Sequence, residues 1–303
     1  MGMDLSLTLL VLLSAVMHAT WNAMVKVERD RLTAFALIHG TGAVLGAILV
    51  ALAPPLRPEA WEYLAPSVVL QAAYIGILML AYQAGDLSQV YPIARGSAPL
   101  GVTLLATLGG APLPPLQIAG VAAVSAGILS LAWRSAPQDA PLGEPGGGAP
   151  KARTWLPIAY ALALGLNIAA YTVLDSHGVR AGGSPLAYGG WVFILYGLPW
   201  MAAALLRAGR RGQLRLRGGL GLRRPEPRHW VLALGAGSLC FAAYLAVVWA
   251  LRVAAAAPVS ALRETSVIFA ALIGTVLLKE PLGVRRVIAA LAVAAGSGMI
   301  RLA

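Results

Sequence analysis

Residues 17–26 read MHATWNAMVK, and residues 167–175 read NIAAYTVLD. In both stretches polar side chains recur every four positions, which places them on one face of a helix. These side chains belong to His18, Asn22, Lys26, Asn167, Tyr171 and Asp175. Their neighbours are mostly apolar, and a lipid bilayer penalises polar groups unless they face protein or a water-filled cavity. The repeated stripe therefore predicts two related membrane-spanning helices that border a shared polar path.

The chain as a whole is far more apolar than a soluble protein. Of its 303 residues, 59% are hydrophobic and 12% are charged, whereas soluble domains have about 25% charged residues. Because a span needs about 20 apolar residues, we predict an all-α integral membrane protein with ten transmembrane helices. The predicted spans are residues 4–25, 33–53, 64–83, 90–110, 114–133, 155–174, 185–206, 230–250, 258–278 and 283–301.

A Pro- and Gly-rich stretch at 134–154 divides the chain into two halves, 1–133 and 155–303. This composition is typical of a flexible linker. The halves match locally, because the polar stripes align with each other and Arg95 aligns with Arg263. Each half has five predicted spans, and an odd number means that the two copies insert in opposite directions. We therefore predict two inverted five-helix repeats around a central cavity.

Eight of the 23 Lys and Arg residues, which together give the chain its net charge of +11, cluster in one region. Residues 207–228 contain eight arginines, which under the positive-inside rule form a cytoplasmic loop against anionic lipid headgroups. When the loops are assigned alternately to the two sides, most Lys and Arg residues fall on the side of this loop, so both termini are predicted to lie outside. No nucleic-acid recognition motif accompanies the arginines, and we expect no nucleic-acid binding.

Four stretches resemble one family of membrane proteins. They are MHATWNAMVK at 17–26, GDLSQVYPIARGSAPLGVTLLA at 85–106, NIAAYTVLD at 167–175 and ALRETSVIFAALIGTVLLKEPLG at 261–283. The resemblance is to EamA-type members of the drug/metabolite transporter (DMT) superfamily, and it covers nearly the whole chain outside the linker and the arginine-rich stretch. It implies two inverted EamA-like repeats around a cavity that opens alternately to each side. It also implies secondary active transport of a small metabolite, often as export.

From this resemblance we expect a multi-pass protein of the bacterial cytoplasmic (inner) membrane. Its solute would be an amino acid or another small molecule that bears a carboxylate or a phosphonate.

Arg95 and Arg263 each lie inside a predicted span, and a guanidinium can bind a carboxylate or phosphonate with two hydrogen bonds. The inverted topology predicts Arg95 toward the cytoplasm and Arg263 toward the outside, so each would hold or gate the substrate at its own mouth. The structural alternative is that both side chains extend to the headgroups.

Glu264 is the one acidic residue deep in a predicted span, and it could carry a coupling proton or gate the path. A structural ion pair is the alternative. On a helix Glu264 and Arg263 point about 100° apart, so they are not expected to pair with each other.

Other residues of the spans suggest the wall of a cavity. Aromatic rings with a few directional polar groups suit an amphipathic organic solute, and hydrogen bonding or packing between helices is the structural alternative. The predicted substrate-binding residues, which include the two arginines, are His18, Trp21, Asn22, Tyr82, Arg95, Asn167, Tyr171, Tyr244 and Arg263. Trp191, Tyr196 and Trp200 are interpreted instead as interface anchors or lipid-facing residues.

No catalytic motif accompanies these residues. The spans contain no H-E-x-x-H or G-x-S-x-G sequence and no acidic pair, and the chain has no phosphate-binding loop. We expect no catalytic residue, no metal site and no cofactor. The expected partners of this monomer or homodimer are a small-molecule substrate, membrane lipids and a coupling proton or ion. A membrane-embedded enzyme and a non-transporting structural or sensory protein are the alternative functions.

Overall fold

The computed structural model describes residues 3–26, 31–84, 87–132, 155–210, 227–278 and 283–303. Within these residues the secondary structure is helical and contains no strand. The elements are α1 (Leu5–Lys26), α2 (Arg31–Leu52), η1 (Pro58–Ala60), α3 (Trp61–Ala84), α4 (Leu87–Leu108), α5 (Pro115–Ser130), α6 (Leu156–Gly182), α7 (Pro185–Arg210), α8 (Pro227–Val253), α9 (Ala256–Glu264), α10 (Ser266–Leu278) and α11 (Val284–Leu302). The predicted linker at 134–154 and most of the arginine-rich stretch at 207–228 lie outside the described residues.

Long apolar helices make this chain a multi-pass membrane protein. Within the described ranges, seven helical stretches are long and apolar enough to cross a bilayer. Each of the ten predicted spans overlaps helical residues of the structure. The count of ten transmembrane helices and the inverted insertion of the two halves stay predictions.

Two predicted spans differ from the observed helices. The ninth, predicted as one helix over 258–278, is broken at Thr265, where the backbone N–H donates to the carbonyl of Leu262 at 3.2 Å. This hydrogen bond to the third preceding residue tightens the last turn of α9 and separates it from α10. The sixth span, predicted to end at residue 174, continues as α6 to Gly182, where Gly183 ends it with a left-handed φ of 74°. The extension places further polar residues inside a membrane-spanning helix.

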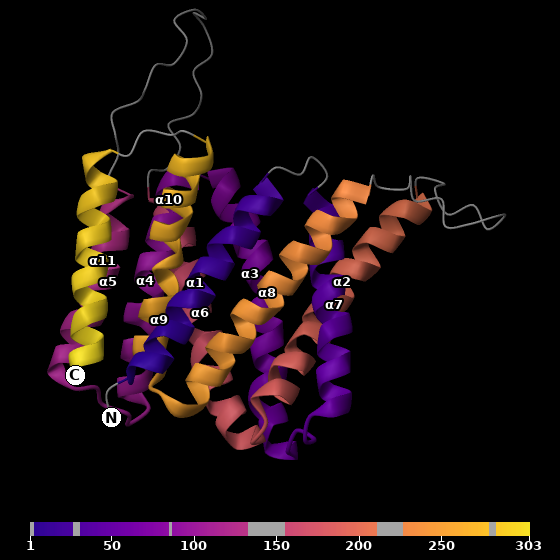
Figure 1. Ribbon diagram of the computed structural model, residues 1–303, viewed down its shortest axis with the longest axis horizontal. Coiled ribbons are helices and arrows are strands. Elements are labelled where there is room, and N and C mark those ends of the chain that lie inside the picture. Colours follow the sequence, from indigo (N-terminus) through magenta and orange to yellow (C-terminus); the bar gives the residue numbers. More distant parts are fainter. Residues whose placement is uncertain (1–2, 27–30, 85–86, 133–154, 211–226, 279–282) are drawn as a thin grey trace, which may run out of the picture.

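The most extensive helix–helix contacts join one half of the chain to the other. α2 lies against α7, α5 against α11, α3 and α4 against α6, and α1 against α8. In Figure 1 the pair α5 and α11 lies at one end of the molecule and the pair α2 and α7 at the other, with both chain ends on the same side of the bundle. Two related halves are expected to make contacts of this kind. The centre of the bundle is therefore formed by helices of both halves.

Small residues allow the closest of these contacts. A Cβ atom built on Gly46 of α2 would lie 2.6 Å from the carbonyl oxygen of Gly190 on α7, and one on Gly120 of α5 would lie 2.8 Å from that of Gly296 on α11. Since real Cβ contacts are longer, glycine is required where these backbones cross.

Candidate functional site: a cavity between the two halves

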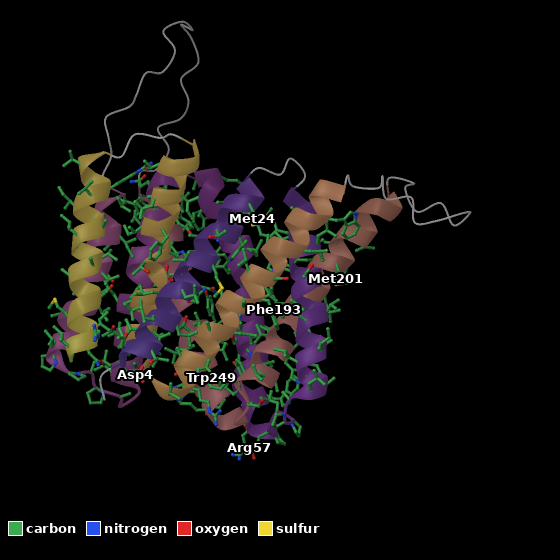
Figure 2. The ribbon with its side chains drawn as sticks, viewed as in Figure 1. Asp4, Met24, Arg57, Phe193, Met201 and Trp249 are labelled. Atoms are coloured by element: carbon green, nitrogen blue, oxygen red, sulfur yellow. The ribbon has the colours of Figure 1, made fainter. Side chains whose placement is uncertain are left out.

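A cavity of about 660 Å³ lies between the two halves of the chain. Its volume is within the range of pockets that bind small molecules. Phe193, which borders the cavity, lies near the middle of the bundle, whereas Arg57 lies at one end (Figure 2). The wall is formed by α1, α2, α3 and α4 of the first half and by α6, α7, α8 and α9 of the second.

The cavity brings together most of the residues singled out by sequence. Those that line it are His18, Trp21, Asn22, Arg95, Tyr171, Tyr244 and Arg263. Asn167 is buried in α6 one turn before Tyr171 and does not line the cavity. Glu264 is fully buried behind the wall. Tyr82 belongs to α3, but its side chain lies outside the part of the chain that the structure describes. Binding of a substrate by these residues stays a prediction.

The Arg95 guanidinium is held by three other side chains. Its Nη1 lies 3.0 Å from Glu264 Oε1 and 2.9 Å from Oε2, its Nη2 lies 2.6 Å from His18 Nε2, and its Nε donates to the hydroxyl of Tyr91 at 3.2 Å. A guanidinium can only donate, so Nε2 of His18 accepts and the imidazole is the neutral tautomer with its proton on Nδ1. Arg95 is 4% exposed, so it does not extend to the headgroups. It joins α1, α4 and α9 at one point.

Arg263 has a different environment. It lines the same cavity as Arg95, so the two arginines do not face separate mouths of the path in this structure. Its side chain is half-buried, and within the described residues its hydrogen bond is from Nη2 to the hydroxyl of Tyr171 at 3.5 Å, the limit of such a contact. Glu264 pairs with Arg95 rather than with its neighbour Arg263, as helical geometry predicts. Arg263 therefore presents a cation to the cavity with most of its donors unused.

Aromatic side chains of α2 and α7 form another part of the wall. Phe35 stacks on Trp200 with ring centroids 5.3 Å apart, His39 stacks on Trp200 at 5.9 Å, and Tyr196 meets His39 edge-on at 4.8 Å. All four line the cavity. The interpretation of Tyr196 and Trp200 as interface or lipid-facing residues is therefore wrong, because they face the interior, and Phe35 and His39 were missed. The four-residue spacing of aromatic side chains in both helices was the available signal.

Two buried polar atoms of residues that line the cavity have no hydrogen-bond partner among the described residues. They are Nε1 of Trp21 and Nδ1 of His39, whose side chains are 8% and 5% exposed. Buried polar atoms are nearly always paired with protein, water or ligand. The two atoms can therefore pair with polar atoms of a molecule that occupies the cavity.

Asp175 lies beside the cavity. The sequence did not predict a carboxylate deep in the membrane here, because the predicted sixth span stopped at residue 174. Its side chain is 1% exposed. Oδ1 accepts hydrogen bonds from Ser67 Oγ at 2.5 Å and from the hydroxyl of Tyr188 at 2.9 Å, and Oδ2 accepts one from the hydroxyl of Tyr244 at 2.8 Å. Four helices therefore meet at this carboxylate, namely α3, α6, α7 and α8.

Comparison with known proteins agrees with this arrangement. The model of the EamA-like transporter family matches residues 155–302. No curated protein matches the chain. A solved structure described as "Crystal structure of protein" has the same fold, with a TM-score of 0.71 at 16% identity over 98% of this chain and 95% of that chain. The family comprises membrane transporters of small solutes. Residues 155–302 of this chain therefore form an EamA-like transporter domain, the domain of the drug/metabolite transporter superfamily.

Proposed function

We propose that this protein is a secondary active transporter that exports a small amphipathic metabolite by alternating access. The solute carries a carboxylate or a phosphonate, and an amino acid is the leading class. The single observation that carries the proposal is the cavity between the two halves. It is lined both by Arg263, most of whose N–H donors are unused by the described residues, and by a wall of aromatic side chains.

The polar part of the cavity suits an anionic group. Arg263 faces it with most of its N–H donors unused by the described residues, and a planar guanidinium binds carboxylate or phosphonate oxygens with two parallel hydrogen bonds. Asn22 and Tyr171 line the same cavity and supply further directional contacts. Arg95 also lines the cavity, but its charge is balanced by Glu264 and its donors are occupied by Glu264, His18 and Tyr91.

The apolar part suits a hydrophobic or planar side chain. The rings of Phe35, Trp200 and Tyr196 give it flat surfaces, and such surfaces favour stacking on a ring or on aliphatic groups. Nε1 of Trp21 and Nδ1 of His39, which have no partner among the described residues, can orient a solute that carries a polar atom on this side. This combination explains why an amphipathic solute is favoured over an inorganic anion.

The setting in the cell is inferred from the family resemblance and from the charge pattern. We propose a bacterial inner membrane, with the arginine-rich stretch at 207–228 in the cytoplasm and both termini outside. Two five-helix repeats, residues 1–133 and 155–303, would exchange the opening of the cavity between the two sides. A membrane-embedded enzyme is the alternative, and membership of a transporter family argues against it.

Transport in proteoliposomes tests the proposal. Vesicles that contain the purified protein are loaded with a mixed pool of amino acids and organophosphonates, and mass spectrometry follows the exchange of each compound with an isotopically labelled external pool. Selective exchange of one class is expected, with none in vesicles that lack the protein. Failure of every compound to exchange under a proton or sodium gradient, in protein that remains folded, would contradict the proposed substrate class.

A further inference from the structure

Two carboxylates are buried beside the cavity among the described residues, and their surroundings differ. Glu264 is 0% exposed and lies 2.9 Å from Arg95 Nη1, so its negative charge is balanced by an ion pair. Asp175 is also buried, but within the described residues it forms no ion pair, and its hydrogen-bond partners are three hydroxyl groups. A carboxylate inside a membrane domain is costly without a cation and marks a functional position. Asp175 is therefore the better candidate for a group that changes charge.

The three hydroxyls can stabilise Asp175 in either protonation state. In the structure Ser67, Tyr188 and Tyr244 donate to the carboxylate, as an ionised group requires. A hydroxyl also has acceptor lone pairs, so any of them can rotate and accept a hydrogen bond from the protonated acid. Arg and Lys cannot do this, because they only donate. The surroundings therefore permit gain and loss of a proton without leaving a buried polar atom unpaired.

Two residues connect this carboxylate to the cavity. Tyr244 lines the cavity and donates its hydroxyl proton to Oδ2. Gln71 also lines the cavity, and its Nε2 donates at 3.1 Å to Ser67 Oγ, which in turn donates to Oδ1. Tyr188 binds the carboxylate as well, but it is fully buried and does not line the cavity. Tyr244 is therefore the direct route between the cavity and Asp175.

Few charged groups face Asp175 from the helices that pack against α6. The titratable side chains that touch it are Tyr188 of α7 and Tyr244 of α8, while Arg263 of α9 acts on it electrostatically without contact. α3 contributes uncharged side chains, and the described residues of α4 and η1 give it no hydrogen bond or ion pair. On α6 itself, His177 stacks on a tyrosine ring and Arg180 donates to backbone carbonyls of α8 and of the turn that follows it.

We propose that Asp175 is the proton-binding site that couples solute export to the proton gradient, an inference that rests on the proposed transport function. A proton from water on the outer side reaches Oδ2 through the hydroxyl of Tyr244, which then rotates to accept the new hydrogen bond. The proton leaves to the cytoplasmic side after the cavity has changed its opening, so one proton moves inward for each solute exported. Because Ser67 belongs to the first half and Asp175 to the second, the change of charge acts on contacts between the halves.

Asp175→Asn tests the site, because the amide is neutral like the protonated acid and has nearly the same shape. Proteoliposomes receive the mixed pool of amino acids and organophosphonates, and mass spectrometry measures exchange at equal pH and accumulation driven by a pH difference. We expect the variant to retain exchange and to lose pH-driven accumulation. Accumulation equal to that of the wild type would overturn the proposal. So would loss of both processes in a variant with the wild-type melting temperature.

Two tyrosine variants separate proton transfer from simple packing. Tyr244→Phe and Tyr188→Phe each remove one hydroxyl from Asp175, but only the first residue faces the cavity. At comparable exchange rates, pH-driven accumulation should be slower in Tyr244→Phe than in Tyr188→Phe. Equal accumulation in the two variants would overturn the assigned role of Tyr244.

Infrared difference spectra between acidic and alkaline buffer test proton binding without any substrate. The wild type, and Glu59→Gln as a control at an exposed acid, should show the band of a carboxylic acid in an apolar environment. The band should be absent from Asp175→Asn, and its persistence there would overturn the proton site. If the band is lost as expected but the wild type exchanges no compound, the proposed transport function fails and the proton site stands.

Discussion

Arg95 Nη1 lies 2.9 Å from Glu264 Oε2, so a buried ion pair joins α4 of the first half to α9 of the second. The same guanidinium contacts Nε2 of His18 on α1 at 2.6 Å. Glu264 lies one residue before Thr265, where the helix breaks between α9 and α10. This geometry favours Arg95 as a fixed point between the halves and leaves Arg263 as the cation that is available to a solute.

Glu264→Gln should destabilise the protein by about 3–5 kcal/mol, because it leaves the buried Arg95 charge without its partner. Thermal unfolding in detergent measures the loss, with Glu59→Gln at an exposed position as the control. The double variant Arg95→Gln/Glu264→Gln should recover part of it, since no unpaired charge remains. A melting temperature of Glu264→Gln equal to that of the wild type would show that the ion pair contributes nothing to the fold.

His18→Ala should cost about 1–3 kcal/mol, because Nη2 of Arg95 loses its acceptor in a buried site. His18→Gln should be closer to the wild type, since its side-chain oxygen can accept the same hydrogen bond. Melting temperatures of the two variants decide the point. If both melt at the same temperature, the hydrogen bond to Nε2 is not what stabilises this region.

Helical periodicity was sufficient to predict the polar face of α1 and its place on the cavity. Residues four apart share a face whatever their tertiary contacts, so His18 and Asn22 could be assigned together. The partner of Glu264 could not be predicted, because it comes from a helix far away in the chain. The break of one residue at Thr265 could not be predicted from the sequence either, since the residues on both sides of it favour helix.

Trp200→Leu should weaken the binding of solutes with an aromatic ring by roughly two- to tenfold, because each aromatic contact is worth about 0.5–1.5 kcal/mol. Solutes without a ring should be affected less. The measured quantity is the concentration that gives half-maximal exchange in proteoliposomes. Trp249→Leu, at a residue that is 46% exposed on α8, is the matched control. Equal shifts for both solute types would argue against an aromatic subsite at α2 and α7.

Gly46→Ala should destabilise the protein by about 1–3 kcal/mol, because its Cβ would lie 2.6 Å from the carbonyl oxygen of Gly190. Gly76→Ala is the matched control, since a Cβ at that position meets nothing within 4 Å. Thermal unfolding of the two variants compares them directly. Equal stability would mean that α2 and α7 can separate at no cost.

Aromatic residues show where sequence patterns fail in a membrane protein. A Trp or Tyr near a helix end suits the lipid interface, but the same residue can face a cavity, and periodicity does not distinguish the two. Trp200 lines the cavity, whereas Trp191 packs against Trp61 with ring centroids 5.1 Å apart. For Asp175 the error had another origin, because the predicted sixth span ended at residue 174, just before Asp175, whereas α6 continues to Gly182.

Exchange by Arg263→Gln in proteoliposomes tests the central claim most directly, because Arg263 faces the cavity and the described residues leave most of its donors unused. Losing hydrogen bonds to a charged group should raise the half-saturating concentration of the exchanged anion roughly tenfold to a hundredfold. Arg252→Gln, at an exposed arginine of α8, should exchange like the wild type. If Arg263→Gln also exchanges like the wild type, the solute is not held by this cation and the proposed site is wrong.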